Sequence, residues 1–224
     1  NTYLGPRGYT IPKQELTETQ IQYLRKTLTV RPVTGGSAFG AVETVEYPIY
    51  RESSNKMYLP RFYGKSVFGE VKRMAIHPGD DIGIEFAGSL RPIQVPVVDI
   101  YVKSVGGEYG GGGLLELPCA FGKTLLSLNI IARLKKKTLV IVNKEFLLNQ
   151  WVERISQFLP DAKVGRIQGP EIDIDGKDIV IGMLQSISMK DYDAKTFESF
   201  GLTIIDEVHH ISSEVFSRAL FKIV

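Results

Sequence analysis

Two short stretches of this chain carry residue types that could do phosphate chemistry. The first is Gly122-Lys123-Thr124, which stands at the start of an apolar stripe of helical spacing that ends at Ile131. Backbone N–H groups and the positive end of a helix dipole favour an anion at such a start. Lys123 would reach the β- and γ-phosphates of a nucleotide, and the Thr124 hydroxyl would ligate Mg²⁺. Taken alone, the tripeptide fits an ordinary surface helix equally well.

The residues before Gly122 depart from the full phosphate-loop pattern. Leu117 stands where that pattern has a glycine, and Ala120 stands where many such loops have a second one. An alanine forced into positive φ at that point would be strained by about 1 kcal/mol. We expect residues 114–117 to form a short strand. The expected nucleotide-contacting loop then consists of consecutive residues: Pro118, Cys119, Ala120, Phe121, Gly122, Lys123, Thr124 and Leu125.

The second stretch is a strand that runs into two adjacent carboxylates. Residues 202–205 are mostly apolar and β-branched, and Asp206 and Glu207 follow directly. Strands of a parallel sheet are covered on both faces, and ligands bind at their carboxyl ends. Asp206 is therefore placed to hold Mg²⁺, usually through its water, and Glu207 to polarise an attacking water as general base. Two solvated acids are the alternative reading, but the upstream Lys123 tripeptide favours a site for ATP and Mg²⁺.

Elements of alternating type must position these two stretches. Residues 138–142 and 179–182 are further apolar runs of the length of buried strands. The helix expected between them has one apolar stripe that includes Trp151, and Pro160 ends it. We therefore expect Trp151 to lie in the core. Strands that alternate with helices predict an α/β fold with a parallel sheet.

Several motifs, in order along the chain, resemble those of superfamily-two DExH helicases. Asp206-Glu207-Val208-His209 reads as the DExH box, and other motifs of that group match residues 90–94, 117–123, 143–151 and 178–186. The loop and the Leu-x-x-Gln-Trp sequence that ends at Trp151 resemble the XPB-like branch. The chain is most similar to the helicases of large nucleocytoplasmic DNA viruses, relatives of the poxvirus transcript-release helicase. The resemblance covers residues 90–224.

This resemblance implies an ATP-dependent helicase with the fold, cofactors and partners of that family. The implied fold is RecA-like, the cofactors are ATP and Mg²⁺, and the polymer is DNA or RNA. Arg91 would pack against the adenine base, and Gln94 would hydrogen-bond its edge. His209 would couple the ATP site to the path of the strand. Contacts with the nucleic acid would come from residues at strand ends: Lys144, Gln185 and Ser186.

The N-terminal part of the chain has a different pattern of residue types. Residues 1–88 alternate short β-prone pieces with Gly and Pro, which predicts a small β-rich domain ahead of a RecA-like domain over residues 89–224. One short helix is expected after a cap at Thr17 or Thr19. Expected strands cover residues 28–32, 42–50, 56–63 and 82–86.

Basic residues interleave with aromatic ones in this N-terminal domain, between residues 50 and 73. Cations can bind phosphates and aromatic rings can stack on bases, so the domain could contact nucleic acid. A small domain also needs large aromatic side chains to fill its core. We therefore favour the interpretation that the aromatics are core and the cations are its solvated face.

The recognised motifs stop before a second RecA-like domain. The resemblance implies that such a domain closes over ATP and supplies arginine fingers. We therefore expect these 224 residues to be the N-terminal portion of the motor, which binds nucleotide but hydrolyses it slowly. Two alternatives stay open: the motor half of a restriction-type translocase, and a non-catalytic module that recruits nucleic acid or a partner. The altered phosphate loop mildly favours the second alternative.

Composition adds a few constraints. The net charge of +2 shows no strong preference for polyanions, although a local basic groove is enough for a nucleic-acid motor. The single cysteine, Cys119, allows no internal disulfide and indicates a reducing compartment. No stretch is long and apolar enough to span a membrane. We expect an intracellular protein, cytoplasmic (viral factory or virion) if viral and nuclear otherwise, with transcription or repair machinery as possible partners.

Overall fold

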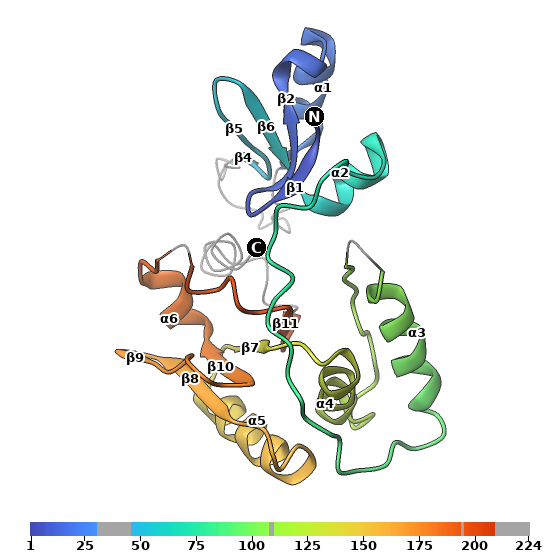
Figure 1. Cartoon of the computed structure of the whole chain (residues 1–224), viewed down its shortest axis with the longest axis vertical. Helices are drawn as coiled ribbons and strands as arrows, with labels where there is room; N and C mark the ends of the chain where they lie inside the picture. Colours follow the sequence, from blue (N-terminus) through green and yellow to red (C-terminus); the bar gives the residue numbers. More distant parts are fainter. Residues whose placement is uncertain (31–45, 108–109, 194, 209–224) are drawn as a thin grey trace, which may run out of the picture. The chain divides into compact units, whose positions relative to one another are not determined.

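The chain divides into two compact units, with the division between Ile76 and His77. A computed structural model, shown in Figure 1, describes residues 1–30, 46–107, 110–193 and 195–208. No helix among these residues is long and apolar enough to cross a membrane. The division falls twelve residues before the boundary expected after residue 88.

An antiparallel sheet of order β1-β2-β6-β5 organises the N-terminal unit. Its strands are β1 (Tyr3–Gly5), β2 (Gly8–Pro12), β5 (Arg51–Glu52) and β6 (Lys56–Leu59), and β3 (Thr29–Val30) pairs separately with β4 (Tyr47–Pro48). Two helices, α1 (Glu18–Thr27) and α2 (Arg61–Phe68), and the 3-10 helix η1 (Lys13–Glu15) complete the unit. Thr17 caps α1 in a capping box with Gln20, as the sequence predicts.

One face of this sheet is the core of the unit. Leu4, Tyr9 and Leu59 are buried on it, and the Tyr9 ring stacks on Phe68 with the ring centroids 6.2 Å apart. The expected strand over residues 56–63 was wrong in its last part, because Pro60 precedes a helix rather than continuing the ladder. Gly64 of that helix lies so close to Tyr9 that a Cβ there would be 2.3 Å from the ring.

The second unit is built on a sheet of order β11-β7-β10-β8-β9. Neighbouring strands are parallel except β9, which is antiparallel to β8. The strands are β7 (Thr138–Val142), β8 (Val164–Gln168), β9 (Glu171–Ile172), β10 (Ile179–Met183) and β11 (Leu202–Ile205). The helices are α3 (Val95–Val105), α4 (Lys123–Leu134), α5 (Glu145–Phe158) and α6 (Leu184–Met189).

Helices cover both faces of this sheet, which explains its apolar strands. Val140 and Val142 of β7 pack in one cluster with residues of α4 and α5. Leu139 and Ile141, which alternate with them, pack in a second cluster with residues of α6. Trp151 of α5 is only 2% exposed, as expected for a core residue. The predicted α/β fold with a parallel sheet is confirmed.

Residues 82–86 do not form a last strand of the N-terminal unit. They run as irregular backbone along the second unit, where Ile82 and Ile84 are buried in the cluster of α4 and α5. The Ile82 amide donates to the Lys135 carbonyl at 3.0 Å, and the Ala87 amide to the Phe158 carbonyl at 2.8 Å. These contacts explain why the division of the chain comes before this segment.

The apolar residues 114–117 also differ from expectation, because the structure assigns them no strand. Leu115 and Leu117 instead pack partly buried against Val98 of α3 and Leu126 of α4. Helix α3 begins at Val95, which places Pro96 in its first turn, where the missing N–H costs no hydrogen bond.

Candidate active site

Within the loop expected to bind phosphate, Gly122 is the N-cap of α4 and has a left-handed conformation (φ 95°, ψ 41°). Ala120 also has positive φ, at 61°. This is the conformation in which we expected an alanine to be strained, by about 1 kcal/mol. Lys123 at the first position of α4 is exposed, and Thr124 is half-buried. The start of α4, whose first N–H groups have no partner within the helix, thus carries an exposed cation, a combination that favours anions.

The side chains of Arg91 and Gln94 bind the backbone of the loop that precedes α4. The Gln94 amide nitrogen and the Arg91 guanidinium each donate to the Phe121 carbonyl at 2.6 Å. The Gln94 amide oxygen accepts from the Arg91 backbone N–H at 2.8 Å, and Gln94 is only 1% exposed. The Arg91 guanidinium also lies 5.7 Å from the centroid of the Phe121 ring. Gln94 thus fixes the loop backbone, and its contact with adenine stays a prediction.

The two carboxylates follow β11 directly. The Asp206 backbone N–H donates to the Ile141 carbonyl at 3.0 Å, so the end of β11 stays joined to β7. The Asp206 side chain accepts from Trp151 Nε1 at 2.9 Å through Oδ2 and from the Glu207 N–H at 3.0 Å through Oδ1. Glu207 itself is exposed and has a positive φ of 56°. The protein therefore binds both oxygens of the Asp206 carboxylate, and the exposed Glu207 stands directly beside it.

Two non-glycine residues with strained backbone lie in the loop before α4 and directly after β11. Within the described ranges, the non-glycine residues with positive φ are Ala120, Lys135 and Glu207. Lys135 ends α4, where such a conformation is common. Ala120 and Glu207 belong to the phosphate loop and to the carboxylate pair. Strain of this kind, about 1–3 kcal/mol each, gathers at functional sites.

Packing brings α4 beside β11, the strand that Asp206 follows. Leu128 and Ile131 of α4 are buried in the cluster that contains residues of β7 and β10. Leu126 is buried in another cluster, against which Leu202 of β11 packs. The helix that begins with Lys123 therefore lies against the strand that carries the two carboxylates.

Three further predicted residues lie at the carboxyl ends of neighbouring strands. Lys144 follows β7 and is exposed at the start of α5. Gln185 follows β10, and its amide nitrogen donates to the Asn143 carbonyl at 3.2 Å. The Ser186 hydroxyl accepts from the Gly169 N–H at 2.9 Å, which connects the end of β10 to the end of β8.

The sequence of residues 87–223 matches the family described as "Type III restriction enzyme, res subunit". The chain belongs to this family. It is 33% identical, over 96% of its length, to "Putative ATP-dependent RNA helicase L396" of Acanthamoeba polyphaga mimivirus, of which it covers 42%. It is also 33% identical, over 57% of its length, to "DNA 3'-5' translocase XPB2" of Sulfurisphaera tokodaii, of which it covers 27%. The chain thus spans less than half of each of these relatives.

A solved structure of the Sulfolobus solfataricus SWI2/SNF2 ATPase core in complex with dsDNA shares the fold, with a TM-score of 0.50 and 20% identity. The match covers 62% of this chain and 30% of that one. The expected RecA-like fold and the resemblance to XPB-like and viral helicases are both confirmed. The chain is accordingly related to proteins that are named as helicases and translocases.

The oxygen atoms of Thr124 and Asp206 are of the type that binds Mg²⁺ in nucleotide-binding domains. Mg²⁺ keeps several waters and takes few protein ligands, beside the phosphates of the nucleotide. The part of the chain that the structure describes has no group of three or more His, Cys, Asp or Glu that could hold a metal ion. Each Asp206 oxygen accepts one hydrogen bond and keeps a lone pair. Thr124 and Asp206 could therefore hold the ion, whereas His209 lies outside the described residues.

Two residues of the candidate site, Trp151 and Asn143, were not predicted from the sequence to belong to it. Sequence reasoning assigned Trp151 to the core alone, because a helical apolar stripe says nothing about the indole N–H. It gave no role to Asn143, whose buried Oδ1 has no hydrogen-bond partner among the described residues. Buried polar side-chain atoms usually have a partner, so an orphan acceptor at a strand end marks a place where a ligand donor or water fits.

Proposed function

We propose that the chain supplies the first ATP-binding domain of an ATP-dependent helicase or translocase, which couples hydrolysis of Mg-ATP to movement on DNA or RNA. The observation that carries this proposal is the packing of α4, which begins at Lys123, beside β11, which Asp206 follows directly. In this proposal the phosphate-binding groups come from a helix and the metal-ordering group from the strand packed beside it, as preorganised catalysis requires.

Each residue of the site has a role in this proposal. The N–H groups of the loop and Lys123 bind the phosphates, and Thr124 and Asp206 hold Mg²⁺, which supplies charge neutralisation when it is bound. Glu207 accepts a proton from the attacking water. Arg91 and Gln94 keep the loop in place and face the adenine base, and His209 couples the site to the nucleic acid. Contacts with the polymer come from the strand ends: Asn143, Lys144, Gln185 and Ser186.

The 224 residues by themselves bind nucleotide and hydrolyse it slowly in this proposal. The reason is that a second RecA-like domain would bring the arginine fingers, which are worth about 10³–10⁵ in rate. The whole protein would act inside a cell, with transcription or repair machinery as partners.

Two observations keep the alternatives in view. The family description names a restriction enzyme subunit, which favours a restriction-type translocase as the complete protein. The strained Ala120 and the Leu117 that replaces a loop glycine favour a non-catalytic module that recruits nucleic acid or a partner.

The test is ATP turnover by this chain, with and without single- and double-stranded DNA and RNA, beside Glu207→Gln and Lys123→Ala. Nucleotide binding that Lys123→Ala abolishes, with slow turnover that Glu207→Gln removes, would support the proposal. Turnover stimulated by one polymer would also identify the substrate. Nucleotide binding and nucleic-acid binding that are both unchanged in Lys123→Ala would support the non-catalytic alternative.

A further inference from the structure

The face of the N-terminal sheet opposite its core carries a row of polar and aromatic side chains. Residues directly opposite each other on antiparallel strands project to the same face. Tyr3 pairs with Thr10, Thr10 with Tyr58, and Tyr58 with Arg51, so these four share one face across β1, β2, β6 and β5. Thr10 is buried between its neighbours, whereas Arg51 is exposed. We call this side the tyrosine face.

Three cations lie over the two tyrosine rings of this face. The Arg73 guanidinium is 5.0 Å from the centroid of the Tyr3 ring, and Lys56 Nζ is 5.3 Å from the same centroid. The Arg7 guanidinium, from the turn between β1 and β2, is 5.3 Å from the centroid of the Tyr58 ring. Such contacts hold a cation in place at about 0.5–1 kcal/mol each when they are exposed.

The segment that follows α2 fixes Arg73 at the edge of the sheet. The Leu4 N–H donates to the Arg73 carbonyl at 3.0 Å, and the Ala75 N–H donates to the Leu4 carbonyl at 2.7 Å. Because Met74 is bridged to Leu4 of the core face, Arg73 projects to the same side as Tyr3. The cations of the tyrosine face are thus held by backbone pairing as well as by ring contacts.

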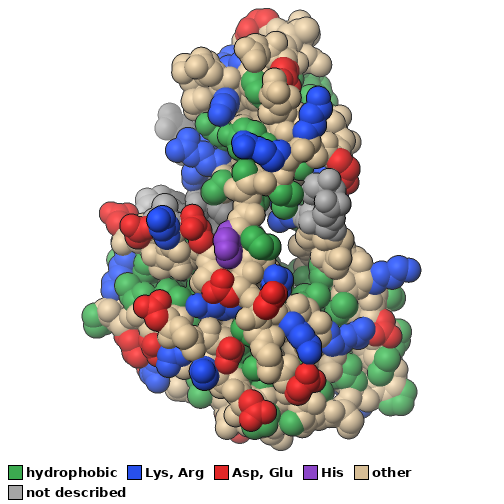
Figure 2. Space-filling model, viewed as in Figure 1, with side chains coloured by type: hydrophobic (Ala, Val, Ile, Leu, Met, Phe, Trp, Pro, Cys, Tyr) green, Lys and Arg blue, Asp and Glu red, His purple; other side chains and the backbone are tan. Residues whose placement is uncertain are grey.

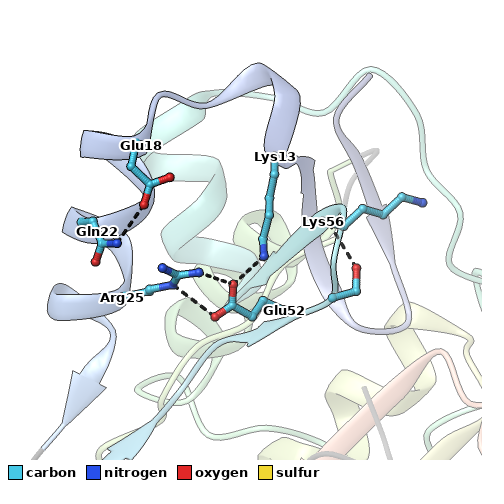
Figure 3. A network of polar contacts seen from close by, with 7 residues as sticks. Lys13, Glu18, Gln22, Arg25, Glu52 and Lys56 are labelled. Atoms are coloured by element: carbon cyan, nitrogen blue, oxygen red, sulfur yellow. Dashed lines mark hydrogen bonds and ion pairs between the residues drawn. The ribbon is translucent and has the colours of Figure 1, made fainter.

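The Glu52 carboxylate lies on the other side of the sheet, because Glu52 is paired with the buried Met57. Glu52, one residue from Arg51, is bound by Lys13 at 2.7 Å and by Arg25 at 2.9 Å, and Figure 3 shows that the Lys56 side chain points away from this carboxylate. Over residues 1–30, 46–107, 110–193 and 195–208, no carboxylate forms an ion pair with Arg7, Lys56 or Arg73. Figure 2 shows Lys and Arg side chains beside hydrophobic ones, a class that includes Tyr, on the visible surface of this unit.

We propose that the tyrosine face binds the phosphate backbone of a nucleic acid strand, with Arg7, Lys56 and Arg73 as the phosphate contacts. The proposal rests on the proposed function for the identity of the polymer. Arg73 and Lys56 lie over the Tyr3 ring and Arg7 over the Tyr58 ring, and the strands of these two tyrosines are two positions, or about 10 Å, apart in the sheet. Cations spread across the face in this way suit a polyanion. A guanidinium has five N–H donors, so one that lies over a ring can still donate to phosphate oxygens.

The test compares the chain with a variant that carries Arg7→Gln, Lys56→Gln and Arg73→Gln. The control variant, Lys26→Gln, Lys65→Gln and Lys72→Gln, loses the same charge from elsewhere in the unit. Fluorescence anisotropy with labelled single- and double-stranded DNA and RNA, at 50 to 300 mM KCl, gives affinity and salt dependence. We expect the first variant to bind at least tenfold more weakly at 50 mM KCl, with a slope of log K against log[KCl] about 2 smaller in magnitude. The control should change both quantities much less.

Equal affinities and slopes in the two variants would overturn the proposal. So would binding of polyglutamate as tight as that of the oligonucleotides, since the face would then suit an acidic protein. Circular dichroism checks folding, and the single Arg7→Gln change in an exposed turn gives a second test, with an expected slope change near 1. Nucleotide binding is measured on every variant: its retention, with loss in Lys123→Ala, separates failure of this proposal from failure of the proposed function.

Discussion

The indole Nε1 of Trp151 donates a hydrogen bond to Oδ2 of Asp206 across 2.9 Å. These residues are 55 positions apart in the chain and belong to α5 and to the end of β11. The bond holds the Asp206 carboxylate in one orientation before any ligand arrives. Because α5 begins directly after Lys144, one helix connects the proposed nucleic-acid contact to the proposed metal-ordering carboxylate. Trp151 is therefore a positioning residue for Asp206.

Replacing Trp151 by Phe should loosen Asp206 while keeping most of the apolar volume. A hydrogen bond to a charged group contributes about 1.5–3 kcal/mol, and we expect the free energy of unfolding to fall by about that amount. We also expect binding of a fluorescent ATP analogue to need several-fold more Mg²⁺, whereas binding without Mg²⁺ changes little. A titration of Mg²⁺ at fixed nucleotide measures this difference.

A merely structural Trp151 would lower stability and leave the Mg²⁺ midpoint where it is, and that result would refute the positioning role. Val152→Ala, on the exposed side of the same helix, is the matched control. Because the chain has one tryptophan, its fluorescence reports on this bond directly in the unmodified protein.

Gly122 and Gln94 should be energetically coupled. A Cβ on Gly122 would lie 2.8 Å from the Gln94 amide nitrogen, and the φ of +95° is unfavourable for alanine. We expect Gly122→Ala to cost about 1–3 kcal/mol of stability and Gln94→Ala about 1–3 kcal/mol. In the double variant the clash is absent, so its cost should be smaller than the sum by at least about 0.5 kcal/mol. Urea unfolding of the four proteins measures this; simple additivity would mean that the clash is relieved without cost.

Glu52 should make the stability of the N-terminal unit depend on pH. Its hydrogen bond to Arg25, followed by that to Lys13, lowers the pKa of the Glu52 carboxyl from 4.5 to about 2. A lowered pKa stabilises the fold above the unfolded value of 4.5, and this contribution is lost as the pH falls towards 2. We expect Glu52→Gln to lower stability by about 1 kcal/mol at pH 7, because solvent screens the pair.

The difference between Glu52→Gln and the unmodified chain should narrow between pH 5 and pH 3, as measured by urea unfolding followed by far-UV circular dichroism. Glu70→Gln is the control, because its partner Lys65 is more exposed than either partner of Glu52. A difference that stays constant over this range would show that ionisation of Glu52 is not the source of the effect.

Much of the fold of both units could be predicted from local pattern. Apolar runs of strand length, helical stripes between them and a cap at Thr17 all depend on residues close in sequence. The same local reasoning failed at residues 82–86 and 114–117. Both are short apolar segments, and their composition does not say whether they pair with a strand or pack their side chains against a helix. The cluster around Ile82 and the one around Leu126 decided that.

The sequence by itself determined the chemistry that this chain can offer: Lys123 and Thr124 at a helix start, Asp206 and Glu207 after a strand, and a strained alanine in the loop. Residue type and spacing are enough for this, because loop, cap and strand end are local features. Only the tertiary structure decided which distant groups complete the sites. The N–H of Trp151 reaches Asp206, Gln94 braces the Phe121 carbonyl, and cations gather over Tyr3 and Tyr58. Such pairs arise from strand register and helix packing, which no short stretch of sequence encodes.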